Sequence, residues 1–348
     1  MISITVEILL WIIMVLLLVC FVCIVYIMMQ RGRVDQQNKR AKRYLEKTKT
    51  LWESYLLEDG FFSVVLIPRG KSEIVAVESL FLSYIHNMYN EEVEEKVREF
   101  SKKYLLKHYE KELKDKNWGK RMNALYKIID FHLVELVPIY ESLNREMKTK
   151  EEQFVLLKIY SVFDKEKFFT IIFSNKYTFS EIEYKQIFSL LDEDILLQLI
   201  EQIEELHLNA QYALIDTVSF KGNIEIIKML ENLLTSSDSE IRIRSLKGID
   251  KMGLVKNFEL YIPFVTSPLW EERLMVAKVF LHVPLKFTYA YLMDLLEDTN
   301  WRVQTQAANT ISEFPDGVQV LNEFILTSVK EDAVKIAEEM LTKRFNLQ

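Results

Sequence analysis

The first thirty positions of the chain carry one unbroken apolar run, Ile8 to Met29, which contains no charged residue, proline or glycine. Because an α-helix rises about 1.5 Å per residue, a helix over these 22 positions would be about 33 Å long. The hydrocarbon core of a bilayer is about 30 Å thick. A helix buried in a water-soluble protein usually keeps a polar face, and this run has none. We therefore expect residues 1–30 to form a transmembrane anchor.

Residues 31–50 form a basic neck after the anchor. Residues 1–50 hold eight Lys or Arg, all of them after Gln30, against three acidic residues. The positive-inside rule places such a flank in the cytoplasm and the short N-terminus outside. The first residues lack Lys and Arg and no small-residue cleavage site follows, so an uncleaved anchor is favoured over a signal peptide. The sequence predicts a single-pass protein of the cell membrane with a cytoplasmic C-terminal domain.

After residue 50 the apolar residues recur with helical spacing, at i, i+3, i+4 and i+7. Only eight glycines and six prolines occur in 348 residues, which favours helices joined by short connections. Residues 51–117 are predicted to be the helical, poorly phased N-terminal part of this body. Within it, Phe61 to Pro68 has a strand-like composition that is equally compatible with a buried connector. The expected fold class is all-α.

The second half of the chain is periodic. Three segments start at equal intervals along it, namely Ile241 to Gly253, Glu272 to Pro284 and Val303 to Pro315. Small or apolar residues recur at their fifth and sixth places, and larger apolar residues at their ninth and twelfth. An apolar helix and a turn precede each segment, which predicts a helical hairpin per repeat. Such hairpins must stack to bury their apolar faces, so residues 118–348 are predicted to be an array with a period of about 31.

The repeated segments follow a V-R-x-x-A-A-x-A-L-x-x-L-G pattern that resembles the HEAT-repeat family, in the short bacterial form also seen in phycobilisome-lyase-like proteins. The resemblance covers about residues 236–341 and extends more weakly back to about residue 118. Glu272 stands where valine is usual, and Gln304 where arginine is usual. The resemblance implies a right-handed α-solenoid behind the transmembrane anchor, with the second helix of each repeat on its concave side. Repeats of this family mostly serve as binding surfaces.

Charge and motif content exclude several function classes. The residues after position 50 carry 36 basic and 48 acidic side chains, a net charge of −12, which disfavours nucleic acid as a ligand. Cys20 and Cys23 lie inside the apolar run, where they are interpreted as small membrane-helix side chains, with palmitoylation or a dimer link as the alternative. No phosphate-binding glycine loop, HExxH or Gly-x-Ser-x-Gly occurs. We expect no enzyme activity, no catalytic residues, no cofactor and no metal.

Six residues near the starts of the second helices are the candidate partner-binding residues. They are Arg242, Arg244, Trp270, Arg273, Trp301 and Arg302. The arginines could form an inter-repeat ladder with carboxylates and carbonyls, or a positive strip for an acidic or phosphorylated peptide. The two tryptophans, which stand one sequence period apart, could be packing residues or aromatic anchors for a partner.

The favoured function is a membrane-tethered cytoplasmic HEAT-repeat scaffold that recruits a protein partner at the bacterial inner or plasma membrane. Ile8 to Met29 would contact the lipid bilayer. A membrane-bound enzyme such as a glycosyltransferase is suggested as the partner by the habits of bacterial scaffolds, not by any residue. The alternatives are a HEAT-like enzyme of the lyase or glycosylase type, which would need a concave cleft, and a passive structural spacer.

Overall fold

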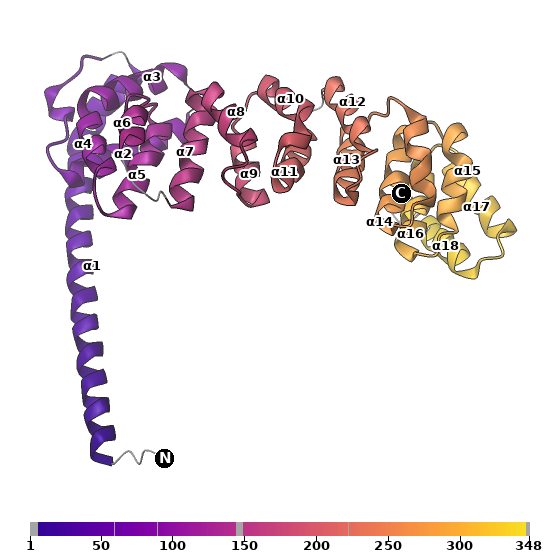
Figure 1. The fold of residues 1–348 in the computed structure, drawn as a ribbon, viewed down its shortest axis with the longest axis horizontal. Helices are drawn as coiled ribbons and strands as arrows, with labels where there is room; N and C mark the ends of the chain where they lie inside the picture. The colour runs from indigo at the N-terminus through magenta and orange to yellow at the C-terminus, as the bar shows by residue number, and fades with distance from the viewer. Residues whose placement is uncertain (1–5, 59, 89, 144–148, 222, 346–348) are drawn as a thin grey trace. The chain divides into compact units, whose positions relative to one another are not determined.

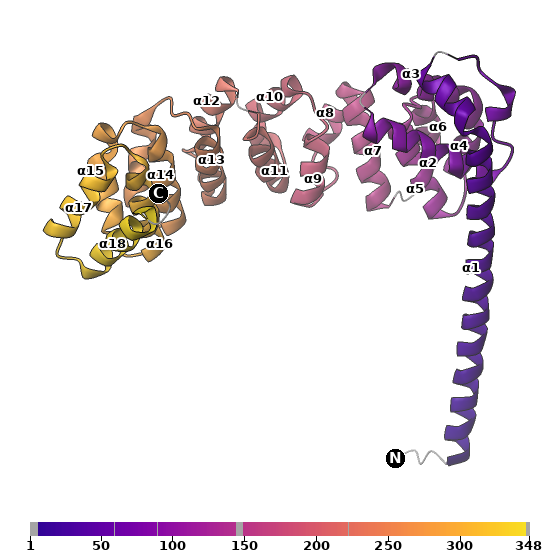
Figure 2. The same cartoon turned by 180° about the vertical axis from the view of Figure 1, so that it is seen from behind.

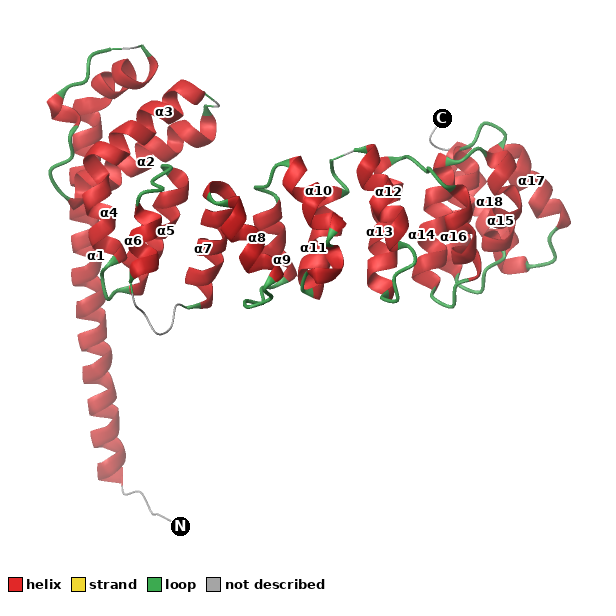
Figure 3. Ribbon diagram, turned by 45° about the horizontal axis from the view of Figure 1, so that its top comes forward, coloured by secondary structure: helices red, strands yellow, loops and turns green. Residues whose placement is uncertain are grey.

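A computed structural model describes residues 6–58, 60–88, 90–143, 149–221 and 223–345. Over these residues the secondary structure is helical, with no strand (Figure 3). This agrees with the expected all-α class. The chain forms two compact units, Met1–Glu152 and Gln153–Gln348. Their boundary lies inside the region predicted as one array of repeats.

The first unit consists of helices and their connections. They are α1 (Val6–Leu57), α2 (Lys71–Asn87), α3 (Glu91–Phe100), α4 (Leu106–Leu113), α5 (Trp118–Asp130) and α6 (Leu136–Ser142). A 3-10 helix, η1 (Val64–Leu66), precedes α2, and a π-helical segment, η2 (Ser101–Leu105), joins α3 to α4. Helix α7 (Lys150–Phe163) begins at the end of this unit.

Helix α1 is one continuous helix of 52 residues that contains the apolar run Ile8 to Met29 and the predicted neck (Figure 1). It is the one helix of the described residues that is long and apolar enough to cross a membrane, with a mean hydropathy of 3.2 over its most apolar window. Its apolar side chains from Leu10 to Met29 are exposed. Residues 1–5, part of the predicted external N-terminus, lie outside the described residues.

The far end of α1 is fixed in the aromatic core of the first unit. Trp52 is fully buried, and its ring meets Phe81 and Phe100 edge-on at centroid distances of 5.2 Å and 5.0 Å. Such edge-to-face pairs add to the free energy gained by burying the rings. The segment Phe61 to Pro68 is a connector that contains η1, and not a strand.

The second unit is a series of short helices. They are α8 (Lys165–Phe173), α9 (Glu181–Phe188), α10 (Glu193–Glu201), α11 (Leu208–Val218), α12 (Ile224–Leu233), α13 (Ser239–Met252), α14 (Trp270–Val279), α15 (Leu285–Leu296), α16 (Trp301–Glu313), α17 (Gly317–Thr327) and α18 (Glu331–Phe345). Three 3-10 helices lie among them, η3 (Ile203–Glu205), η4 (Phe258–Thr266) and η5 (Phe280–His282).

The helices of this unit are arranged as stacked pairs. Helices α9, α11, α13, α14, α16 and α18 pack each against the next, and α10, α12, η4, α15 and α17 pack against members of this row. Figures 1 and 2 show these pairs side by side from opposite directions. The small residues at the repeated fifth and sixth places are buried, as Ser245, Ala277, Ala307 and Ala308 show. Because small side chains let two backbones approach, they allow each second helix to pack closely on its neighbour.

One helix end and one helix type differ from the sequence prediction. Helix α13 ends as expected, with Gly253 in the left-handed conformation at φ 70°. Helix α14 ends at Val279, before Pro284, and a 3-10 turn follows it. The apolar segment before α14, predicted as a helix, is 3-10 helical and contains Pro263, which lacks the N–H that an α-helix interior requires.

A buried carboxylate ties helix α12 to the segment after α13. Glu231 is 4% exposed, and its Oε1 accepts hydrogen bonds from the backbone N–H groups of Lys256 and Asn257 and from the Tyr261 hydroxyl, each at 2.9 Å. Burial and the nearby Glu231 charge raise the pKa of Tyr261 above its ordinary range, so this hydroxyl stays a donor. Glu231 therefore accepts backbone N–H groups of the irregular connection between α13 and η4 and ties this connection to α12.

We predict that Glu231→Ala lowers the free energy of unfolding by about 3 kcal/mol, because three donors lose a charged acceptor. Glu225→Ala removes the same charge from an exposed position of the same helix, and should change stability by less than about 1 kcal/mol. Thermal unfolding of the full chain in detergent, followed by circular dichroism, measures both. Equal losses in the two variants would contradict the assigned role of Glu231.

Candidate functional site

Arg242 joins two successive helix pairs. It is the fourth residue of α13, its Nε donates to Glu272 Oε1 at 2.7 Å, and its Nη1 donates to the carbonyl oxygens of Ser236 at 2.7 Å and Ser237 at 3.1 Å. Glu272, which is 3% exposed, also accepts from the Ser267 hydroxyl at 2.5 Å. Glu272, on α14, therefore supplies the buried carboxylate that Arg242 of α13 binds.

Arg273 repeats the arrangement one step along the chain. Its Nε and Nη2 donate to the two carboxylate oxygens of Asp298 at 2.5 Å and 2.9 Å, and its Nη1 donates to the Ser267 carbonyl at 2.6 Å. Burial alone would raise the pKa of Asp298, but the guanidinium holds it below its ordinary value of 3.8. The side chain of Arg273 is only 14% exposed, so it offers little to an external partner.

The same contact recurs at four positions of the chain, each the fourth residue of its helix. In each, a side-chain nitrogen donates to the carbonyl six residues earlier: Arg121 to Asp115, Arg242 to Ser236, Arg273 to Ser267, and Gln304 to Asp298. Arg121, in the first unit, also donates to Glu152 at 2.7 Å, and Glu152 is fully buried. We call this set the cap ladder.

Sequence reasoning missed Arg121 and Gln304 as members of the cap ladder. A signal was present, because tryptophan stands three residues before three of the four members, as Trp118, Trp270 and Trp301. Each of these tryptophans is the first residue of its helix. Composition hides the shared role of these positions, because arginine is charged and glutamine is not. Both side chains nevertheless present an N–H group that reaches the carbonyl six residues earlier.

Arg244 points to a different set of partners. Its guanidinium donates to Glu181 at 2.7 Å, to Asp216 at 2.8 Å and to Glu240 at 2.6 Å, and it lies 4.8 Å from the centre of the Tyr212 ring. Burial by itself would lower the pKa of Arg244, but the three carboxylates hold that pKa above its ordinary value. Arg244 thus links α9, α11 and α13 within the second unit. Three of the four candidate arginines are engaged inside the protein.

Arg302 and the two candidate tryptophans form an exposed cluster. The Arg302 guanidinium lies 5.1 Å from the Trp270 ring centre and 5.5 Å from the Trp301 ring centre, within the range of cation–π contacts. Trp301 is 64% exposed, Arg302 is exposed and Trp270 is half-buried. Among the described residues, no carboxylate forms an ion pair with Arg302. We call these three residues the Trp–Arg cluster.

A cavity of about 590 Å³ lies at the C-terminal ends of α9, α11 and α13. Four lysines contribute to its lining: Lys185, Lys221, Lys247 and Lys251. Lys185 is paired with Glu181 and Asp216 at 2.6 Å each. Lys185 and Lys251 lie in the last turns of α9 and α13, where a cation is favoured by the negative end of the helix dipole, so part of this basic lining has a local structural cause.

The described residues contain no group of three or more His, Cys, Asp or Glu side chains that could hold a metal ion. His282 Nε2 lies 3.1 Å from Asp250 Oδ1. Among the described residues, no hydroxyl or thiol side chain is hydrogen-bonded to this pair to act as a nucleophile. The arrangements present here are suited to binding by charge and by aromatic contact.

No family model matches the chain, and no curated protein matches it. Among solved structures, it is similar to two engineered proteins from a structural genomics consortium. The first has 14% identity and a TM-score of 0.37, and the match covers 89% of this chain and 99% of that one. The second has 15% identity and a TM-score of 0.24, with 77% and 96% covered.

We predict that Asp298→Asn destabilises the protein by about 2 kcal/mol at neutral pH, because Arg273 loses a charged acceptor. The lowered pKa of Asp298 gives stability that is present above its ordinary value of 3.8 and is lost as the pH falls through the folded value. The stability difference between wild type and variant should therefore be constant above about pH 5 and shrink below about pH 4.

Thermal unfolding between pH 3 and pH 7 measures this difference. Asp294→Asn is the matched control, since Asp294 is exposed on the preceding helix. A wild-type-minus-variant difference that stays constant down to pH 3 would show that Arg273 does not lower the pKa of Asp298.

Proposed function

We propose that this protein is a single-pass membrane protein whose helical-repeat body, a HEAT-like α-solenoid on the cytoplasmic side, binds an acidic segment of a partner protein. Binding would recruit the partner to the membrane. A tether of this kind raises the local concentration of the partner without any new contact, by holding it near other membrane components.

The membrane anchor is supported by helix α1. Its apolar side chains from Leu10 to Met29 are exposed along the whole of that stretch. Exposing so many large apolar side chains to water would be costly, whereas hydrocarbon would accommodate them. The cations that begin at Arg31 favour the cytoplasm for the residues that follow.

The HEAT-like solenoid is supported by the sequence period of the second half together with the stacked pairs of the second unit. The cap ladder adds a polar contact that recurs with the repeats. Arrays of this type have extended surfaces, to which each repeat contributes the same few positions.

The observation that carries the binding proposal is the Trp–Arg cluster. Tryptophan and arginine are the residues most enriched in binding hot spots. Here Arg302 has no carboxylate partner among the described residues, while the neighbouring cap-ladder arginines have one. Its charge is therefore available to a carboxylate of a partner, and the Trp301 ring offers an adjacent apolar face. A membrane-bound enzyme remains the kind of partner that tethering would serve best.

We predict that the neck lies in the cytoplasm. Lys49→Cys, in a Cys20→Ser/Cys23→Ser background, should not react with a membrane-impermeant maleimide in intact cells, but should react once the cells are permeabilised. Ile2→Cys in the same background should react in intact cells. Labelling of position 49 in intact cells would contradict the proposed orientation.

We predict that a photo-crosslinking amino acid at position 301 of the full chain gives a discrete adduct in native membranes. Arg302→Glu should reduce this adduct at least about fivefold, because it repels an acidic partner. Arg302→Lys should retain most of it, since the positive charge remains.

Position 287 is the matched control for crosslinking, because Phe287 is also exposed and lies beside a lysine, Lys286. Trp301 is so exposed that its replacement should leave stability unchanged within about 0.5 kcal/mol. Equal adducts at both positions, or an adduct at 301 that is insensitive to charge reversal, would favour the passive spacer.

A further inference from the structure

A strongly basic cavity of about 720 Å³ lies in the first unit, between the neck part of α1 and the connection into α2. It is open to the surface, and its cations, all of them exposed residues, are Arg40, Arg43, Lys47, Arg69 and Lys71. The carboxylate in the lining is Glu73, whose Oε2 accepts a hydrogen bond from the Arg69 backbone N–H at 2.7 Å. Five cations and one carboxylate leave a net lining charge of +4, in a chain whose net charge is −7.

The neck sorts its cations onto two faces. At about 100° per residue, Arg40, Arg43 and Lys47 lie within about 60° of one another around the helix axis. Lys42 and Lys49 lie on the opposite face, where they approach Glu46 at 3.9 Å and Glu53 at 3.8 Å. The face with acidic partners thus points away from the cavity, and the face without them lines it.

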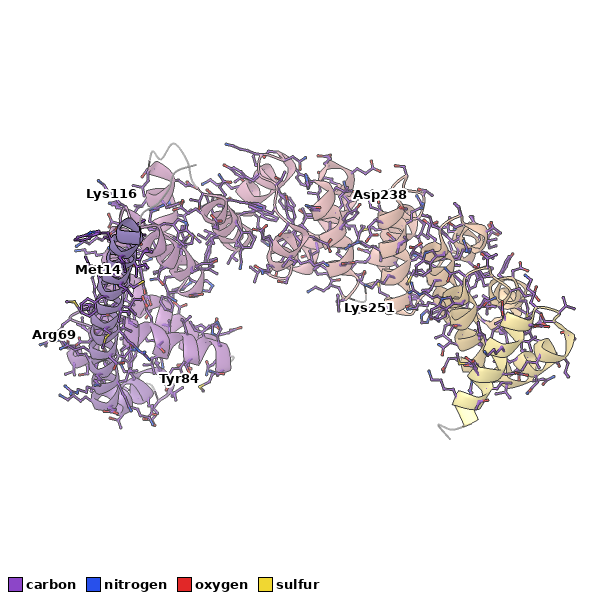
Figure 4. All side chains as sticks on the ribbon, turned by 90° about the horizontal axis from the view of Figure 1, so that it is seen from below. Met14, Arg69, Tyr84, Lys116, Asp238 and Lys251 are labelled. Carbon is purple, nitrogen blue, oxygen red and sulfur yellow. The ribbon has the colours of Figure 1, made fainter. Side chains whose placement is uncertain are left out.

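None of the five cavity cations forms an ion pair with a carboxylate among the described residues. The carboxylate of Asp115 is bound by Lys120 at 2.5 Å, and this contact is the main cause of its lowered pKa. The Lys71 charge contributes to that lowering without forming an ion pair. Arg69, labelled in Figure 4, lies beside α1. Five like charges around one cavity repel each other, so an anion placed among them would be attracted by all of them.

We propose that this cavity binds the phosphate group of a small phosphorylated ligand that carries at least two negative charges. Arginine and lysine together are the side chains that recognise phosphate best, through forked and point-charge contacts respectively. The cavity has the volume of a small-molecule site rather than of a single ion, and Tyr44, Val65 and Ile67 give it an apolar edge.

The start of α2 adds donors to the same cavity. Gly70, Lys71 and Ser72 all line it. The N-cap of α2 is Gly70, which makes no side-chain cap hydrogen bond, so the first N–H groups of the helix lack a side-chain acceptor. Such groups favour an anion, and they add to the attraction that the five cations exert on it.

The source of the phosphate group is a soluble molecule rather than a lipid headgroup, because of distance. Along a helix that rises about 1.5 Å per residue, Arg40 and Lys47 lie about 16 Å and about 27 Å beyond Met29. The headgroup layer of a bilayer leaflet is only about 5–8 Å thick. This step rests on the proposed membrane span, whereas the affinity of the cavity for phosphate does not.

The test is calorimetric titration of inorganic pyrophosphate into the full chain in nanodiscs of neutral lipid. We expect saturable binding that weakens as salt is added. Arg43→Gln/Lys47→Gln should weaken it at least about tenfold, because two charge-assisted contacts are lost. Lys42→Gln/Lys49→Gln removes the same charge from the opposite face of the same helix and should leave the affinity within about twofold of wild type.

Repeating the titration in nanodiscs rich in anionic lipid separates the sources. Unchanged affinity in the anionic discs supports a soluble ligand, and competition by the anionic lipid assigns the phosphate group to a headgroup. No binding in neutral discs, or equal losses in the two double variants, would overturn the proposal. The crosslinking at position 301 is independent of this result, because it reports on a different unit of the protein.

Discussion

A helical pair has two apolar sides and can bury only one of them by itself, and the second unit of this protein is organised by that constraint. Each second helix, from α9 through α18, must pack on the next. Ser245, Ala277, Ala307 and Ala308 allow this because their small side chains lie in the contact. A large side chain at these places would separate neighbouring helices and leave cavities in the layer.

The cap ladder adds a polar condition to this packing. Its side chains bind a carbonyl of the turn before their own helix, and Arg242 and Arg273 also bind a carboxylate of the following pair. A buried carboxylate such as Glu272 is tolerated only with such partners. Of the two arrangements that the sequence left open for these arginines, Arg242 and Arg273 therefore adopt the inter-repeat ladder and not a free positive strip. In the last member of the cap ladder glutamine, Gln304, takes the place of arginine, and the neighbouring Arg302 is exposed.

The two candidate binding regions differ in the kind of surface they offer. The Trp–Arg cluster combines one cation with two aromatic rings, which suits a segment of a protein. The cavity beside α1 combines five cations with a few apolar atoms, which suits a compact multiply charged anion. In both places, exposed charges without an ion-pair partner among the described residues stand close to other charges that are paired.

The apolar run, the helical spacing and the sequence period were sufficient to predict an all-helical chain with one long apolar helix, because periodicity and composition are local properties. The positions of Gly253 and of the buried small residues followed from the same pattern. Which cations are engaged was decided by tertiary structure alone, because the partners of Arg244 lie on helices far away in sequence. The continuity of α1 and the placement of Arg43 and Arg69 around one cavity also required the fold. A sequence shows where charges are, but only packing determines which of them are neutralised.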